Sequence, residues 1–125
     1  MLLNISQYSS ETLQEQIIGQ IRARILSGDL GPDEPLTSIR ELAQTLRLGV
    51  NTVQRAYEHL IREELVYARP GKGYFVAPLN AADKQDVARE RFRQGLQSLI
   101  DAASREGLSD ADVEQLFHQI QKGTK

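Results

Sequence analysis

The sequence contains no cysteine and no tryptophan, and it has no long apolar run. Without cysteine, disulfide bonds and thiolate metal ligands are excluded. No stretch approaches the roughly 18 apolar residues that a membrane-spanning helix needs. The first residues also lack the basic and apolar regions of a secretory signal. We therefore expect a cytoplasmic protein with no membrane partner.

An excess of basic charge is missing as well. The 125 residues include 15 basic and 17 acidic side chains, a net charge of −2, and the 40% hydrophobic content is that of a globular protein. The charge is uneven, because residues 36–78 hold six basic and four acidic residues, whereas both flanking segments are net acidic. Contact with a polyanion is therefore most compatible with the middle segment.

Catalytic and metal-binding patterns are also absent from the sequence. His59 and His118 lie on separate predicted elements, and neither has acidic residues at a metal-ligand spacing. The stretch 70–73 lacks the longer phosphate-loop pattern, and no nucleophile, base and carboxylate occur in a persuasive arrangement. We expect no enzymatic activity, no metal and no cofactor.

The sequence does contain several short amphipathic segments. Apolar residues at helical spacing predict a helix over residues 11–27, with Ser9 or Ser10 as its N-cap and Gly28 as its stop. A short helix follows Thr37 or Ser38, and its buried side includes Leu42, Ala43 and Leu46.

A second helix of this pair is predicted after Gly49, and a hairpin follows it. The apolar side of this helix is predicted to hold Val53, Ala56, Tyr57, Leu60 and Ile61. Two helices joined by a Gly-containing turn are typical of a helix-turn-helix. Residues 65–69 and 74–77 are rich in β-branched and aromatic side chains and flank a Pro-Gly-Lys-Gly turn, which predicts a β-hairpin. We expect a mainly α fold with this small hairpin: a winged helix-turn-helix domain over residues 1–78 and a helical tail over 79–125.

The tail predicts two helices separated near Gly107, the second capped by Ser109. Each helix has an apolar stripe, and a pair of helices this short buries little core by itself. A twin tail is the favoured partner, so we assign the stripes to a homodimer interface. The residues assigned to dimerisation are Phe92, Leu96, Leu99, Ile100, Val113, Leu116, Phe117 and Ile120.

The middle segment predicts a DNA-binding surface. A helix fits the major groove, and the N-terminal residues of a recognition helix reach the base edges. The polar side of the second helix offers such groups at Asn51, Thr52, Gln54 and Arg55. Glycines at the hairpin tip let Lys72 approach a phosphate or the minor groove, and Arg69 adds charge nearby.

Three linked motifs make this interpretation more specific. Leu36-Thr37-Ser38-Ile39-Arg40-Glu41-Leu42-Ala43, the segment 51–60 and Pro70-Gly71-Lys72-Gly73-Tyr74-Phe75-Val76 resemble the opening signature, recognition helix and wing of GntR-family bacterial transcription regulators. The short two-helix tail resembles the YtrA-type members, whose tails mediate dimerisation. The resemblance implies DNA contacts at Arg40, at positions 49–52 and 54, and at the wing tip. Together with Arg55 and Arg69, the predicted DNA-binding residues are Arg40, Gly49, Asn51, Thr52, Gln54, Arg55, Arg69, Gly71 and Lys72.

The function implied is a homodimeric regulator, a repressor, that binds an inverted-repeat double-stranded DNA operator. An effector small molecule is compatible with this function, and the sequence assigns no binding site to it. The alternative is a winged-helix module that binds proteins and not DNA, which the negative net charge favours. Salt-sensitive binding to DNA separates the two, because the interaction module would show none. A small enzyme is a weaker alternative, since no catalytic pattern supports it.

Overall fold

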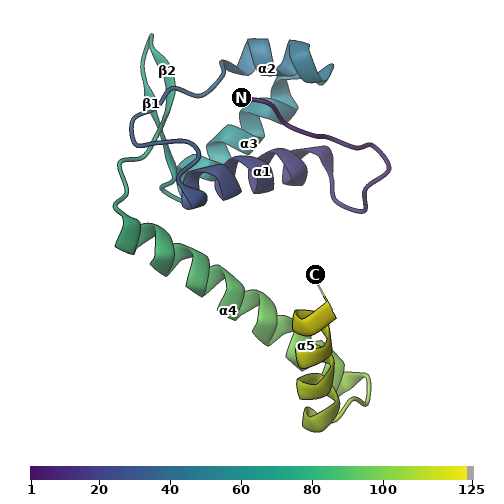
Figure 1. Ribbon diagram of the computed structural model, residues 1–125. Helices are drawn as coiled ribbons and strands as arrows, with labels where there is room; N and C mark the ends of the chain where they lie inside the picture. The colour runs from purple at the N-terminus through teal and green to yellow at the C-terminus, as the bar shows by residue number, and fades with distance from the viewer. Residues whose placement is uncertain (124–125) are drawn as a thin grey trace. The chain divides into compact units, whose positions relative to one another are not determined.

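The computed structural model describes residues 1–123 and divides the chain into two compact units, residues 1–85 and the part from Asp86 onward. Figure 1 shows the elements in order: α1 (Leu13–Ser27), α2 (Ile39–Leu46), α3 (Val50–Arg62), β1 (Val66–Arg69), β2 (Gly73–Val76), α4 (Ala81–Arg105) and α5 (Asp110–Gly123). The predicted mainly helical fold with one antiparallel hairpin is confirmed. Within residues 1–123, no helix has the length and apolarity to cross a membrane.

The N-cap of α1 differs from the predicted one. Thr12 caps the helix: its Oγ1 accepts the N–H of Glu15 at 3.0 Å, and the Glu15 carboxylate accepts the N–H of Thr12 at 2.8 Å. Ser9 and Ser10 cannot form this reciprocal pair, because neither is followed three residues later by a Glu or Gln side chain. Gly28 ends the helix as predicted, with φ at +88°.

One apolar core holds the first unit together. Ile17, Ile21 and Ile25 of α1 are fully buried, as are Tyr57 and Leu60 of α3. Burial against about ten neighbours is typical of such core residues. The helices α1 and α2 both pack on α3, and this packing fixes which side of α3 remains in solvent.

A buried hydroxyl connects α3 to the start of α2. The Tyr57 side chain donates its O–H to the main-chain oxygen of Thr37 at 2.6 Å. Burial raises the pKa of Tyr57, and the neighbouring Tyr74 and Glu41 raise it further, so the hydroxyl stays a neutral donor. This bond satisfies the buried O–H and fixes the chain just before the Ser38 N-cap of α2.

The hairpin is attached to the unit by a third extended segment. In the hairpin, Val66 pairs with Val76 and Arg69 with Gly73. On the other edge of β2, the N–H of Leu36 donates to the oxygen of Tyr74 at 2.8 Å, and the N–H of Val76 donates to the oxygen of Glu34 at 2.9 Å. These bonds hold the base of the wing, so that its tip projects from an anchored support (Figure 1).

An ion-paired cluster joins α1 to the end of α3. Arg22 donates to both carboxylate oxygens of Glu63, at 3.1 and 2.7 Å, and the ring Nε2 of His59 lies 3.1 Å from the same carboxylate. Partial burial would by itself raise the pKa of Glu63, but the hydrogen bonds and charges of Arg22 and His59 lower it below its ordinary value. The cluster fixes the C-terminal end of α3 against α1.

We expect this cluster to make the stability pH-dependent. Since the folded-state pKa of Glu63 is depressed, its contribution is present above the ordinary value of 4.5 and is lost as the pH falls through the folded-state pKa. Glu63→Gln should therefore cost about 1 kcal/mol of unfolding free energy near neutral pH, and clearly less in acid. Urea unfolding at both pH values measures the difference, with Glu64→Gln as the control. An equal cost at both pH values contradicts the expectation.

Candidate nucleic-acid interface

The outer side of α3 carries the polar residues that the sequence predicts for base contact. Asn51, Gln54 and Arg55 are exposed, and Thr52 is half-buried. The opposite side holds Val53, which is fully buried together with the other core residues of α3. One face of the helix is therefore anchored in the core, and the other is open to a ligand.

The N-terminus of α3 leaves main-chain donors available. Gly49 is the N-cap, and as a glycine it has no side chain with which to cap the first turn. Free N–H groups at a helix start favour phosphate oxygens because they combine donors with the positive end of the helix dipole. Gly49 was predicted as a contact residue, and its exposed position allows a main-chain contact. That contact stays a prediction.

Arg40 lies at the second residue of α2. Ser38 caps this helix by accepting the N–H of Glu41 at 3.1 Å, which places Arg40 in the first turn. The Arg40 side chain is exposed, and no side-chain hydrogen bond or ion pair to it occurs within residues 1–123. An unpaired guanidinium at this place is able to bind a phosphate with two parallel hydrogen bonds.

The wing tip is a tight turn of residues 70–72. The N–H of Lys72 donates to the oxygen of Arg69 at 2.9 Å, and Gly71 has φ at +74°, a conformation that a side chain would strain. Lys72 is exposed at the tip. The Arg69 guanidinium lies 5.4 Å from the centre of the Phe75 ring, so this cation is held on the wing strand by a cation–π contact.

Val50, within the contact stretch 49–52 that the resemblance implies, is 49% exposed at the first position of α3. Two residues of the same surface were missed by the sequence analysis. Glu58 and Arg62 are exposed further along the helix. Extending the helical period from Asn51 by 4, 3 and 4 residues reaches Arg55, Glu58 and Arg62, so periodicity could have found both charged residues.

The tail exposes the apolar side chains that the sequence assigns to dimerisation. Phe92 is 63% exposed and Leu99 70% on α4, and Ile120 is 63% exposed on α5. Leu116 and Phe117 are also exposed, whereas Leu96, Ile100 and Val113 are half-buried. No residue of α4 or α5 within the described chain is fully buried. Exposed apolar side chains of this size on both tail helices favour an interaction surface.

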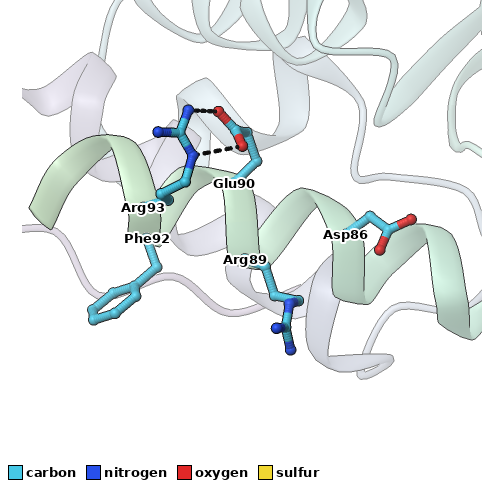
Figure 2. Close-up of a pocket in the computed structure, with 5 residues that line it drawn as sticks. All are labelled: Asp86, Arg89, Glu90, Phe92 and Arg93. Carbon is cyan, nitrogen blue, oxygen red and sulfur yellow. Dashed lines mark hydrogen bonds and ion pairs between the residues drawn. The ribbon is translucent and has the colours of Figure 1, made fainter. Parts of the chain in front are cut away.

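Part of the α4 surface is drawn in Figure 2. Phe92 and Arg89 extend from one side of the helix, while Glu90 accepts two hydrogen bonds from Arg93 on another side, at 3.0 and 2.6 Å. The carboxylate of Glu90 is thus paired within its own helix. The exposed ring of Phe92 has no comparable aromatic or cationic contact among residues 1–123.

No group of three or more His, Asp or Glu side chains within residues 1–123 is arranged to hold a metal ion.

The geometry of the first unit defines a winged helix-turn-helix: two helices joined by a short turn, a recognition helix with an open polar side, and an anchored hairpin. This fold is typical of transcription regulators that bind DNA.

Comparison with known proteins identifies the family. Residues 13–76 match "Bacterial regulatory proteins, gntR family". The chain belongs to this family of transcription regulators, and it is of the YtrA type. It is 27% identical over 124 residues to the HTH-type transcriptional repressor YtrA of Bacillus subtilis, covering 99% of this chain and 95% of the relative. It is also 32% identical over 107 residues to the repressor NagR of the same organism. That match covers 86% of this chain but only 41% of the length of NagR.

Solved structures share the fold. A transcriptional antiterminator from Listeria monocytogenes EGD-e has a TM-score of 0.74 and 26% identity, with 97% of this chain and 90% of that one covered. YtrA from Sulfolobus acidocaldarius, a GntR-family transcription factor, has a TM-score of 0.61 and 29% identity over 78% and 99% of the two chains. The AraR DNA-binding domain in complex with operator ORE1 has a TM-score of 0.52 and 25% identity over 62% and 94%.

Proposed function

We propose that this protein is a cytoplasmic repressor that binds an inverted-repeat operator as a homodimer and has no enzymatic activity. The helix α3 enters the major groove, and the wing contacts the adjacent backbone or minor groove. The winged domain over residues 1–78 binds DNA, and the tail over 79–125 joins two copies.

The observation that carries this proposal is a set of exposed cations on α2, α3 and the wing that have no protein partner among residues 1–123. The side chains of Arg40, Arg55 and Lys72 have no hydrogen-bond or ion-pair partner among residues 1–123, whereas Arg22 and Arg93 are paired with carboxylates. Free cations on α2, α3 and the wing match the places where a winged helix meets phosphates and base edges. The AraR domain, which is similar in fold, is bound to its operator in its structure, and this likeness supports the docking.

Dimerisation is supported by the tail and by binding energetics. The exposed apolar residues of α4 and α5 need a partner to leave water. One small module buries too little surface for tight operator binding, and a two-fold dimer contacts two half-sites at once. A symmetric homodimer satisfies both requirements.

The test is the salt dependence of DNA binding. We expect the purified protein to select related sequences from a pool of random duplexes, and its affinity for the selected duplex to fall as salt rises. The slope of log affinity against log salt should be about −0.9 per phosphate neutralised, measured by fluorescence anisotropy. Absence of salt-sensitive binding to any duplex would favour the alternative, a winged-helix module that binds proteins.

A further inference from the structure

A carboxylate lies on the surface that we assign to DNA. Glu58 is exposed, and it shares the outer side of α3 with Asn51, Arg55 and Arg62, at helical spacings of 4, 3 and 4 residues. A negative charge facing phosphates weakens attraction to every DNA sequence. Its presence there calls for a role other than affinity.

Glu58 contacts a side chain that is predicted to read bases. The Gln54 amide Nε2 donates a hydrogen bond to Oε2 of Glu58 at 3.3 Å. Among residues 1–123, the Glu58 side chain makes no other hydrogen bond, and both residues are exposed. The contact directs the amide nitrogen of Gln54 along the helix toward Glu58 and leaves its oxygen Oε1 without a protein partner.

The hydrogen bond limits what the Gln54 amide can recognise. A Gln amide has two N–H donors and one acceptor oxygen. With one N–H bound to Glu58, one donor and the acceptor remain. Adenine presents one acceptor, N7, and one donor, the N6 amino group, in the major groove, which match this remainder.

Guanine does not match it. Its major-groove edge presents two acceptors, N7 and O6, which require two donors. The second donor of Gln54 is already used, and the nearby Glu58 carboxylate repels an oxygen such as O6. A base acceptor left unpaired in a closed interface is costly.

We propose that Gln54 and Glu58 act as one base reader that selects adenine over guanine at one base pair of each half-site. Gln54 makes the base contact, and Glu58 is a positioning residue that fixes the orientation of the amide. This inference rests on the proposed function, because it requires α3 in the major groove. It also explains why an acidic residue is compatible with this surface: Glu58 lowers general affinity and raises sequence discrimination.

The experiment is a double-mutant cycle on a duplex selected by the wild-type protein. Gln54→Ala identifies the base pair at which adenine preference is lost. The affinity ratio between that duplex and one with guanine in place of adenine is then measured for wild type, Glu58→Ala, Gln54→Ala and the double variant. We expect Glu58→Ala to lower the ratio about fivefold or more when Gln54 is present, and to leave it unchanged when residue 54 is alanine.

A charge control separates discrimination from general attraction. Glu64→Gln also removes one negative charge from this unit, but Glu64 lies after the end of α3 with φ at +62°. It should raise affinity slightly for both duplexes and leave their ratio unchanged. A wild-type protein that selects no sequence defeats the proposed function itself. If the protein does select a sequence, three results overturn this inference alone. The adenine-to-guanine affinity ratio of Glu58→Ala equals that of wild type, or adding Glu58→Ala to Gln54→Ala lowers the ratio as much as it does in wild type. The third result is a selected duplex with guanine at the base pair that Gln54 contacts.

Discussion

A single charge in the tail, Leu99→Glu, is expected to convert the protein to a monomer and to weaken operator binding by about a hundredfold or more. The loss is large because each half-site contact in the dimer holds the other module at high effective concentration. A monomer must bind each half-site independently. No contact with DNA is changed by this substitution, so the whole effect would come from assembly.

Leu99 suits this test because little of its side chain is buried within its own chain. It is 70% exposed on α4, and the described helices of the tail contain no fully buried residue. A glutamate there should leave the monomer folded, since exposed substitutions typically change stability by less than about 0.5 kcal/mol. In a dimer the same charge would have to be buried without a partner, which is strongly unfavourable.

Sedimentation equilibrium measures the oligomeric state of the variant, and circular dichroism measures whether it is folded. Ser98→Glu is the matched control, because Ser98 is exposed and lies one residue away, off the apolar stripe of α4. It should remain a dimer and bind the operator normally. A dimeric Leu99→Glu protein, or a Ser98→Glu protein that dissociates equally, would place the interface elsewhere.

The helical elements were predictable because burial leaves a periodic pattern in the sequence. Spacing placed Val53, Ala56, Tyr57, Leu60 and Ile61 on one side of α3; the structure buries the first four and leaves Ile61 half-buried. The stop at Gly28 followed from the residue type that a left-handed backbone favours. The polar side of α3 was then predicted as the complement of the buried side, which is why Asn51 and Arg55 were found.

Long-range hydrogen bonds were not predictable in the same way. Gln16 is 6% exposed, and its amide accepts from the N–H of Ser6 and donates to the oxygens of Ser6 and Glu11. Nothing periodic marks a buried glutamine that holds a segment ten residues earlier. The pairing of Leu36 with Tyr74 is similar, because its partners are 38 residues apart and one bridge leaves no alternation in the sequence.

Glu58 was missed for a different reason. Residue types that attract DNA were the ones predicted as contacts, and an acidic side chain on the recognition helix is not one of them. Its significance depends on the hydrogen bond from Gln54, which spacing permits but does not establish. Discrimination among sequences requires groups that reject as well as groups that attract.

The second large effect is expected at the phosphate contacts. Arg40→Ala and Lys72→Ala should each weaken binding to the selected duplex by about tenfold, and each should reduce the magnitude of the salt slope by about 1. Arg40 projects from the first turn of α2 and Lys72 from the wing tip, so the two side chains belong to separate elements. Because neither side chain has a protein partner within residues 1–123, their removal leaves no buried group unpaired.

The slope distinguishes a phosphate contact from an indirect effect on folding. A structural defect would lower affinity at every salt concentration, whereas loss of a phosphate contact costs most at low salt and little at high salt. Arg105→Ala, which removes an exposed cation from the end of α4, is the control and should leave affinity and slope unchanged. If Arg40→Ala and Lys72→Ala both keep the wild-type slope, α2 and the wing do not meet the backbone, and α3 would have to approach DNA in another orientation.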